Sequence, residues 1–260
     1  MLDAFYKRDG DLYLATELTR GPWDPGAQHG GPPSALLARE LERLPDAEEF
    51  QVSRISFDFL GPVPIGPARL SARVLRPGRR VQLVEAELSD GKRVLMRATA
   101  WRIRIAPVDL PADAVTMAEP PPPPERGSQS GFFPSGQEHG YHTAMDVRFI
   151  EGGFLETGPA TVWLRMRQPL VAGEEPSPLQ RVLLAADVGN GVSSNLDYRR
   201  FLFINVELTL HLERMPAGDW VCVEAVTLAR PSGVGTAESV LSDRQGRIGR
   251  ALQSLLIAER

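Results

Sequence analysis

The sequence places the same order of predicted elements along the chain twice, and this repeat restricts the fold more than any other feature. In each half a largely apolar helical stretch precedes several segments in which apolar and polar residues alternate. The predicted helices cover 32–44 and 178–187, and both have proline in the first turn, where an N–H would lack a partner. The repeat predicts one structural unit that occurs twice.

The predicted strands fall at matching places in the two halves. Alternating segments at 54–60 and 205–212 end near turns rich in proline and glycine, and another strand follows each turn. Further on, Ser-Asp turns within 88–94 and 241–248 each join two more strands. An antiparallel sheet can cover a helix with its inner face, and two such sheets can join edge to edge. The sequence therefore predicts an α+β fold.

A proline-rich segment separates the two halves. Residues 120–124 are five consecutive prolines, and a stretch rich in glycine and serine follows them. Because proline cannot continue a helix or join the interior of a sheet, we expect an extended polyproline II spacer here. The expected units are therefore a first repeat at 1–110, a linker at 111–137 and a second repeat at 138–260. A ligand segment for a proline-binding domain is the alternative interpretation.

Composition and charge argue against several classes of function. Apolar residues make up 42% of the 260 residues, which is enough for a hydrophobic core. The net charge is -4 and the basic residues are scattered, so we expect no nucleic-acid partner. The sequence has neither a signal-peptide pattern nor an apolar run of about 20 residues, so we expect a cytoplasmic protein without a membrane span. Cys222 is the single cysteine, and we predict a small buried hydrophobic residue there.

An acid stands among the apolar positions of the second predicted helix. Asp187 lies near the end of that helix, before Gly189-Asn190-Gly191, a run typical of a left-handed helix terminator. A carboxylate is disfavoured at a helix C-terminus, because the helix dipole is negative there. The first helix shows only leucines as inward candidates between Ser34 and Leu44, so packing alone does not require an acid. Asp187 is either a polar terminating residue or a functional group.

These residues resemble a known family, the double hotdog acyl-CoA thioesterases, and specifically the acyl-CoA thioesterase II-like group, over roughly 22–258. In the first half the resemblance rests on His29-Gly30-Gly31 before the helix and on the strand and turn at 55–62. In the second half Asp187, Asn205 and Gln253 fall where these enzymes carry a helix aspartate, a hydroxyl residue, usually threonine, and a strand glutamine. The resemblance implies two tandem hotdog repeats, each an antiparallel sheet wrapped around a central helix.

The resemblance also implies an activity, the hydrolysis of an acyl-CoA to a fatty acid and CoA. In the family three groups hold the water that attacks the thioester carbonyl, which implies Asp187 as general base, with Asn205 and Gln253 positioning the water. A placed base contributes roughly 100- to 10,000-fold to the rate of such a step. Asn205 departs from the family's usual threonine, because its amide is longer and adds donors. The implied chemistry needs neither a metal nor a cofactor.

The expected substrate contacts come from the first half. We expect His29, Gly30 and Gly31 to bind the acyl-CoA, with backbone N–H groups after the glycines polarising the carbonyl oxygen. The acyl chain is expected in an apolar tunnel between the halves, with one active centre per chain. Double hotdog chains commonly pair, so a homo-oligomer is possible.

Each candidate residue also has an ordinary structural interpretation. Gln253 and Thr99, its expected counterpart in the first half, are alternatively side chains that link the helix to the sheet. Asn205 is alternatively a turn residue at the start of a strand. His29 is either a loop residue bonded to a backbone carbonyl or a base in its own right.

Two other functions remain open at the level of the sequence. One is a protein that binds acyl thioesters or lipids on the same fold without turnover, which the replacement of threonine by Asn205 favours. The other is an enoyl-thioester hydratase, which would pair a helix aspartate with a histidine. His29 belongs to the other half of the chain from Asp187, which argues against that pair.

Overall fold

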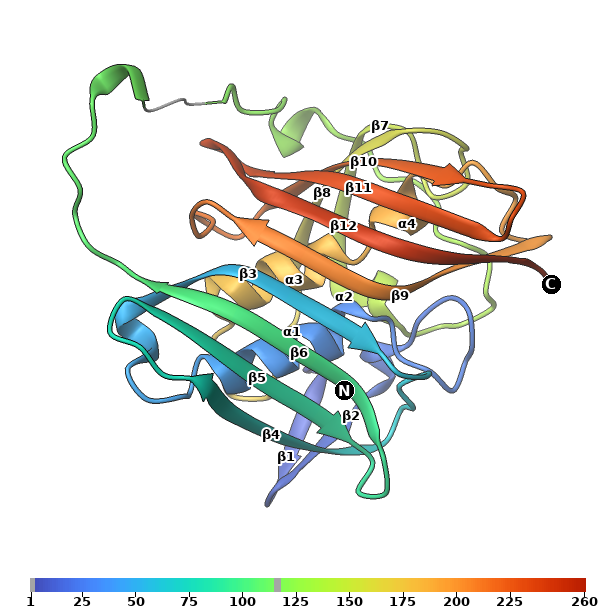
Figure 1. The fold of residues 1–260 in the computed structure, drawn as a ribbon. Coiled ribbons are helices and arrows are strands. Elements are labelled where there is room, and N and C mark those ends of the chain that lie inside the picture. The colour runs from blue at the N-terminus through green and yellow to red at the C-terminus, as the bar shows by residue number, and fades with distance from the viewer. Residues whose placement is uncertain (1–2, 115–117) are drawn as a thin grey trace.

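The computed structural model of the chain describes residues 3–114 and 118–260, and its dominant feature is one 12-stranded antiparallel sheet (Figure 1). The strands of the first half are β1 (Tyr6–Asp9), β2 (Leu12–Ala15), β3 (Phe50–Phe59), β4 (Pro67–Arg76), β5 (Val81–Ser89) and β6 (Val94–Arg104). The strands of the second half are β7 (Met145–Glu151), β8 (Ala160–Met166), β9 (Phe201–Leu212), β10 (Val221–Ala229), β11 (Val234–Asp243) and β12 (Gly246–Glu259).

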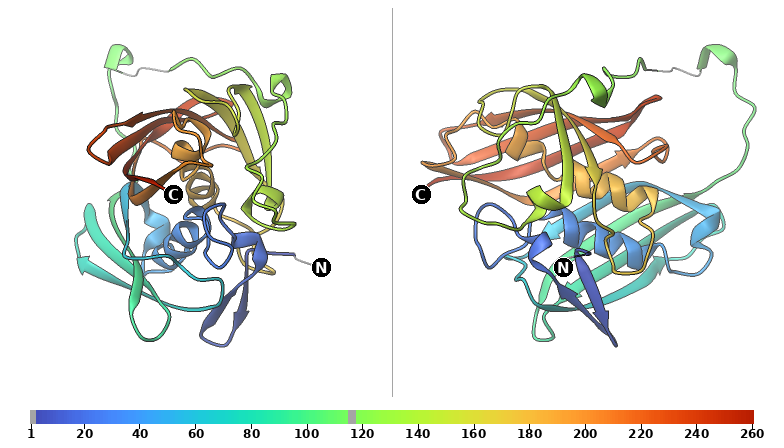
Figure 2. Two further views of the ribbon diagram at one scale, coloured as in Figure 1. Left: turned by 90° about the vertical axis from the view of Figure 1, so that its right-hand side faces the viewer. Right: turned by 180° about the vertical axis from the view of Figure 1, so that it is seen from behind.

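The helices lie inside the curve of the sheet (Figure 2). They are α1 (Gly31–Leu41), α2 (Tyr141–Ala144), α3 (Pro178–Ala186) and α4 (Gly189–Val192), and short 3₁₀ turns occur at Glu17–Thr19, Ala47–Glu49, Ala112–Ala114 and Pro124–Arg126. The long helices α1 and α3 pack against each other, and nearly all of their side chains are buried. Burial on all sides explains why both segments are apolar over more than one face. The hydrophobic core therefore lies between the helices and the inner face of the sheet.

The strand order is the same in both halves when it is followed outward from the middle of the sheet. The full order is β1-β2-β4-β5-β6-β3-β9-β12-β11-β10-β8-β7, so β3 and β9 form the junction between the halves. The β3–β9 ladder is centred on the pair Ser56 and Thr209. Each junction strand also has a bulge, since Ser53 lacks a partner in β6 and Val206 lacks one in β12. A local two-fold relation therefore makes Val52 the counterpart of Asn205.

The repeat predicted from the sequence agrees with these elements. Both long helices and the strands around them are confirmed, with ends shifted by a few residues. The outer strands β1, β2, β7 and β8 were not among the predicted elements. One predicted turn is wrong: Gly189 to Gly191 belong to the short helix α4, and neither glycine has a positive φ. The chain at Asp187 therefore continues into a second helical turn.

The proline run is not a free spacer. The chain leaves β6, loops out from the sheet and returns to the second half (Figure 1). There the Trp163 indole N–H donates to the carbonyl oxygen of Pro122 over 2.8 Å, and the Pro124 side chain is buried at the start of a 3₁₀ turn. Glu125 forms an ion pair with Arg244. The prolines are thus docked on the second half, and residues 115–117 of the expected linker lie outside the described residues.

Candidate active site

Asp187 lies where the end of one long helix meets the start of the other. The Ser177 hydroxyl accepts from the backbone N–H of Gln180 and so fixes the start of α3, and Asp187 is the residue that follows its last turn. Its side chain is 3% exposed, and it faces Gly30 at the N-terminus of α1. The positive end of the α1 dipole therefore opposes the negative end of α3, which removes the objection to a carboxylate at this position.

An acid also follows the last turn of α1, contrary to the expectation that the first half has none there. Glu42 caps α1 as Asp187 caps α3. Glu42 was not predicted, because it lies outside the leucines that face inward within the helix.

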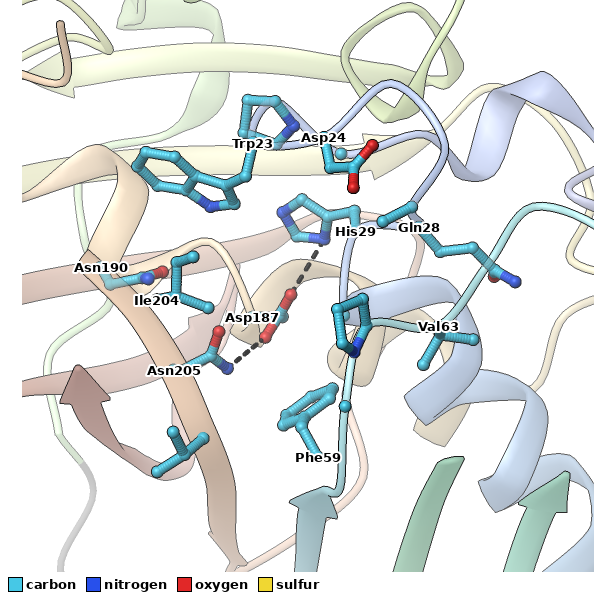
Figure 3. Close-up of a pocket in the computed structure, with 17 residues that line it drawn as sticks. Trp23, Asp24, Gln28, His29, Phe59, Val63, Asp187, Asn190, Ile204 and Asn205 are labelled. Carbon is cyan, nitrogen blue, oxygen red and sulfur yellow. Dashed lines mark hydrogen bonds and ion pairs between the residues drawn. The ribbon is translucent and has the colours of Figure 1, made fainter. Parts of the chain in front are cut away.

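The carboxylate of Asp187 contacts the side chains of Asn205, Gln253 and His29, and Figure 3 shows the contacts to Asn205 and His29. Its Oδ1 accepts a hydrogen bond from Nδ2 of Asn205 over 2.9 Å, and Nε2 of Gln253 lies 3.4 Å from the same oxygen. Its Oδ2 lies 2.9 Å from Nδ1 of His29. The argument that His29 comes from the wrong half to partner Asp187 is therefore wrong, because α1 and α3 pack with opposite ends together.

The imidazole of His29 is held on several sides. Its ring stacks on Tyr141 with centroids 4.0 Å apart and an interplanar angle of 6°. The Tyr141 hydroxyl donates to the carbonyl oxygen of Leu184 over 2.6 Å. Burial raises the pKa of Tyr141 well above its usual value, and the charge of Asp187 raises it further, so this phenol stays neutral. Tyr141 was not predictable from the sequence, because its role depends on packing between the halves.

One nitrogen of His29 faces both a donor and an acid. Nδ1 accepts from the backbone N–H of Gly31 over 3.1 Å and also lies beside the carboxylate of Asp187. When the proton is on Nδ1, the nitrogen donates to Asp187; when Asp187 is protonated, Nδ1 accepts from both neighbours. The His29–Asp187 pair can therefore hold one proton at either of two sites.

Gly30 and Gly31 allow the start of α1 to approach the end of α3 closely. A Cβ atom on Gly30 would lie 2.8 Å from Oδ2 and 2.9 Å from Oδ1 of Asp187, and one on Gly31 would lie 3.0 Å from the carbonyl oxygen of Leu184. The prediction that N–H groups after the glycines polarise a carbonyl is wrong, because Pro32 and Pro33 follow and have no N–H. The N–H of Gly30 donates to no acceptor among the described residues, so it is the free donor here.

Gln253 and Asn205 differ in their access to solvent. Gln253 is 2% exposed; its Nε2 donates to the backbone oxygen of Asp187 over 3.2 Å, and its Oε1 accepts from the N–H of Asn190 over 3.0 Å. Asn205 lies inside β9 next to the bulge at Val206, not at the start of the strand. Its side chain reaches the cavity beside Asp187, whereas Gln253 stands behind the carboxylate.

The expected counterpart of Gln253 was wrong by one residue. Ser56 pairs with Thr99, and its counterpart Thr209 pairs with Leu252, so Thr99 corresponds to Leu252. The next residue, the buried Ala100, corresponds to Gln253. A shift of one residue along a strand changes the face of the sheet, so the first half has no inward polar side chain at this place.

A cavity of about 270 Å³ opens beside these groups and takes its walls from both halves. Trp23, His29 and Phe59 belong to the first half, and Asn205 and Ile204 to the second (Figure 3). Over residues 3–114 and 118–260, no three His, Cys, Asp or Glu side chains gather as a metal site would require. No helix of the same residues has the length and apolar character needed to cross a membrane.

Comparisons with known proteins match both halves of the chain to one family. The family model for the N-terminal domain of acyl-CoA thioesterases matches residues 19–103, and the model for the C-terminal domain matches residues 111–257. The chain belongs to the acyl-CoA thioesterase family. The boundary between the two domain matches falls at the end of β6, where the chain passes from the first half to the second. None of the curated proteins matches this family member.

Solved structures share the fold of this acyl-CoA thioesterase family member along almost its whole length. A putative thioesterase II from Thermobifida fusca has a TM-score of 0.75 at 20% identity, covering 97% of this chain and 95% of its own. A hotdog-fold protein of unknown function from Alicyclobacillus acidocaldarius has a TM-score of 0.75 at 15% identity, with coverages of 98% and 97%. An acyl-CoA thioesterase II from Mycobacterium marinum has a TM-score of 0.69 at 14% identity, with coverages of 97% and 94%. The sheet and its helices therefore form a hotdog-type fold.

Proposed function

We propose that the protein hydrolyses an acyl-CoA to a free fatty acid and CoA, with Asp187 as the general base. The observation that carries this proposal is the buried carboxylate of Asp187 at the cavity wall, contacted by Asn205 on one oxygen and by His29 on the other. The family match supports the class of reaction. The fold supports two tandem hotdog repeats, at 1–110 and 138–260, with a linker at 111–137. In each repeat an antiparallel sheet wraps around a central helix.

The first step is the attack of a water on the thioester carbonyl carbon. A water in the cavity beside Asn205 would donate one proton to the Asp187 carboxylate as its oxygen forms the new bond. The side-chain oxygen of Asn205 offers that water an acceptor, which fixes its orientation. Gln253 does not reach the water; its Nε2 donates to the backbone oxygen of Asp187 and holds that residue in place.

The second step is the collapse of the tetrahedral intermediate. The free N–H of Gly30, at the positive end of α1, can donate to the oxyanion that forms. The C–S bond then breaks, and the proton taken up by Asp187 passes to the CoA sulfur, so that the products are a carboxylic acid and a thiol. Between the two steps, Nδ1 of His29 offers this proton a second site beside Asp187.

The test is CoA release from a panel of acyl-CoAs by the wild-type protein and by Asp187→Asn. This substitution keeps the size of the side chain and removes the base, so kcat should fall about 100-fold or more. Asp219→Asn, in an exposed loop of the same half, is the matched control and should keep the wild-type rate. Equal rates for Asp187→Asn and Asp219→Asn would contradict the mechanism, and saturable binding without CoA release would favour a non-catalytic binding protein.

Enoyl-thioester hydration is a second candidate function, and the 2.9 Å contact between His29 and Asp187 favours it. A hydratase adds water across a carbon–carbon double bond and leaves the thioester intact. Incubation with crotonyl-CoA separates the two reactions, because hydrolysis releases CoA and hydration removes the double bond without releasing it.

A further inference from the structure

A second cavity, of about 300 Å³, lies at the opposite ends of α1 and α3 from Asp187. Its walls include the end of α1, the start of α3, the start of β3 and the loop after β9. Val52 lines it as its counterpart Asn205 lines the first cavity. The local two-fold relation between the halves therefore produces two related cavities.

Each cavity has a carboxylate that caps a helix. Oε2 of Glu42 accepts from the Ser177 hydroxyl over 2.8 Å and from Nε2 of Gln180 over 3.0 Å. Burial raises the pKa of Glu42, and the two hydrogen bonds lower it by less, so the net shift is upward and favours the neutral form. Glu48, the other acid of the second cavity, is exposed, so solvent screens its charge.

The groups around the acid differ between the two cavities. The counterparts of Asn205 and Gln253 are Val52 and Ala100, so the two amides beside Asp187 have no counterpart in the second cavity. Arg102 pairs with Val52 as Leu255 pairs with Asn205, so an arginine takes the place of a leucine. At these three positions the second half has two amides and a leucine, whereas the first half has two apolar residues and a cation.

Arg102 is a buried cation with an unused donor. Its side chain is 3% exposed, its Nε donates to Oε1 of Gln82 over 2.7 Å, and its Nη2 donates to the carbonyl oxygen of Pro45 over 2.8 Å. Its Nη1 is buried and has no hydrogen-bond partner among the described residues. Burial lowers the pKa of Arg102, and the charges of Asp46 and Glu48 raise it without forming an ion pair with the guanidinium. A buried charge in this state is costly, and an anion in the cavity would relieve it.

The rest of the wall fits an apolar chain. The guanidinium of Arg102 lies 5.0 Å from the centroid of the Phe50 ring, which also lines the cavity. The other apolar side chains of the wall include Leu41, Val52, Val84, Ile105, Leu179 and Met215. One cation among apolar side chains matches a ligand with one anionic end and an apolar tail.

We propose that the second cavity binds a fatty carboxylate, with the carboxylate beside the guanidinium of Arg102 and the chain against Phe50, Leu179 and Met215. A guanidinium and a carboxylate form a charge-assisted hydrogen bond, which is stronger than one to a neutral group. The ligand is a free acid, and its binding does not require hydrolysis at Asp187.

Photolabelling locates the ligand directly. The probes are decanoic acid that carries a diazirine in its chain and the matching alcohol, applied to the full chain without any thioester. Peptide mass spectrometry should place the acid's label at 50–52 or at Met215, and the alcohol should label these peptides about tenfold less. Label confined to residues of the first cavity, or equal labelling by acid and alcohol, would overturn the proposal.

Three variants make the assignment specific. Arg102→Met should reduce labelling about tenfold, because it removes the cation and keeps an apolar side chain. Arg104→Met is the matched control: its guanidinium lies 4.9 Å from the same Phe50 ring but does not line the cavity, so labelling should persist. Met215→Trp fills the cavity from a loop and should abolish labelling, which decides the question if Arg102→Met does not fold. Equal labelling in all three variants would also overturn the proposal.

Discussion

Nδ1 of His29 lies 2.9 Å from Oδ2 of Asp187, although the two residues come from different halves of the chain. The contact exists because the start of α1 meets the end of α3 and because Gly30 has no side chain to keep them apart. The candidate active site is therefore a product of the interface between the halves, and neither half contains it alone.

Replacement of His29 by phenylalanine tests whether the imidazole nitrogen matters beyond its ring. His29→Phe keeps an aromatic ring to stack on Tyr141 but removes the contact to Asp187, so we expect kcat for acyl-CoA hydrolysis to fall about tenfold or more. KM should change less, because the lost group acts on the proton and not on the acyl chain. Tyr141→Phe keeps the stack and should retain most of the activity. A wild-type kcat in His29→Phe would assign His29 a purely structural role.

Addition of one methyl group to Gly30 should disturb the site sharply. The new Cβ atom would lie within 2.9 Å of both Asp187 oxygens, so either the carboxylate or α1 must move. We expect Gly30→Ala to lower the free energy of unfolding by about 1 to 3 kcal/mol and to remove most of the activity. Gly66→Ala is the matched control, because a Cβ atom there meets no atom within 4 Å. Urea unfolding and CoA release measure the two effects, and equal behaviour of both variants would contradict the argument.

The repeat predicted the helices and strands that carry this site, and the resemblance to the thioesterase II-like group selected Asp187, Asn205 and Gln253 on three elements of the second half. The structure brings their side chains together. The contact with His29 was not predictable in the same way, because it depends on how α1 and α3 cross. Tyr141 was missed for the same reason.

The misassigned residues show where a repeat alone is insufficient. Thr99 was matched to Gln253, yet the strand register makes Ala100 the counterpart, and a one-residue shift moves a side chain to the opposite face. Glu42 was overlooked because a search limited to the inward leucines of a helix does not include its capping residue. The first error depends on strand pairing in the folded protein, and the second depends on where α1 ends.

The replacement of the family's threonine by Asn205 leads to a paired test. Asn205→Thr retains a hydroxyl that can donate to Asp187 or hold a water, so we expect activity within about tenfold of wild type. Asn205→Val has nearly the same shape as threonine but no polar group, and it copies Val52 of the second cavity. The rate should then fall by a further tenfold or more, because the water loses its partner. Steady-state CoA release from both variants measures the difference, and equal rates for threonine and valine would exclude a polar role at this position.

The turn between β11 and β12 carries a separate prediction on stability and pH. Asp243 is fully buried and accepts from Arg214 over 2.5 and 2.6 Å and from the N–H groups of Ala217 and Gln245 over 2.8 Å. Burial alone would raise the pKa of Asp243, but the hydrogen bonds from Arg214 and from the two backbone N–H groups outweigh it and hold that pKa below its usual value of 3.8.

A lowered native pKa means that Asp243 stabilises the fold while it is ionised. The contribution is fully present above the unfolded pKa and is lost as the pH falls from about 4 through the lower native value. Asp243→Asn should lower the free energy of unfolding by about 2 to 3 kcal/mol at neutral pH, because Arg214 loses its charged partner. The difference between this variant and the wild type should shrink as the pH falls below 4, as urea unfolding at each pH would measure. Asp90→Asn, at the exposed hairpin turn of the first half, should show a smaller difference, and a constant gap for Asp243→Asn at all pH values would contradict the linkage.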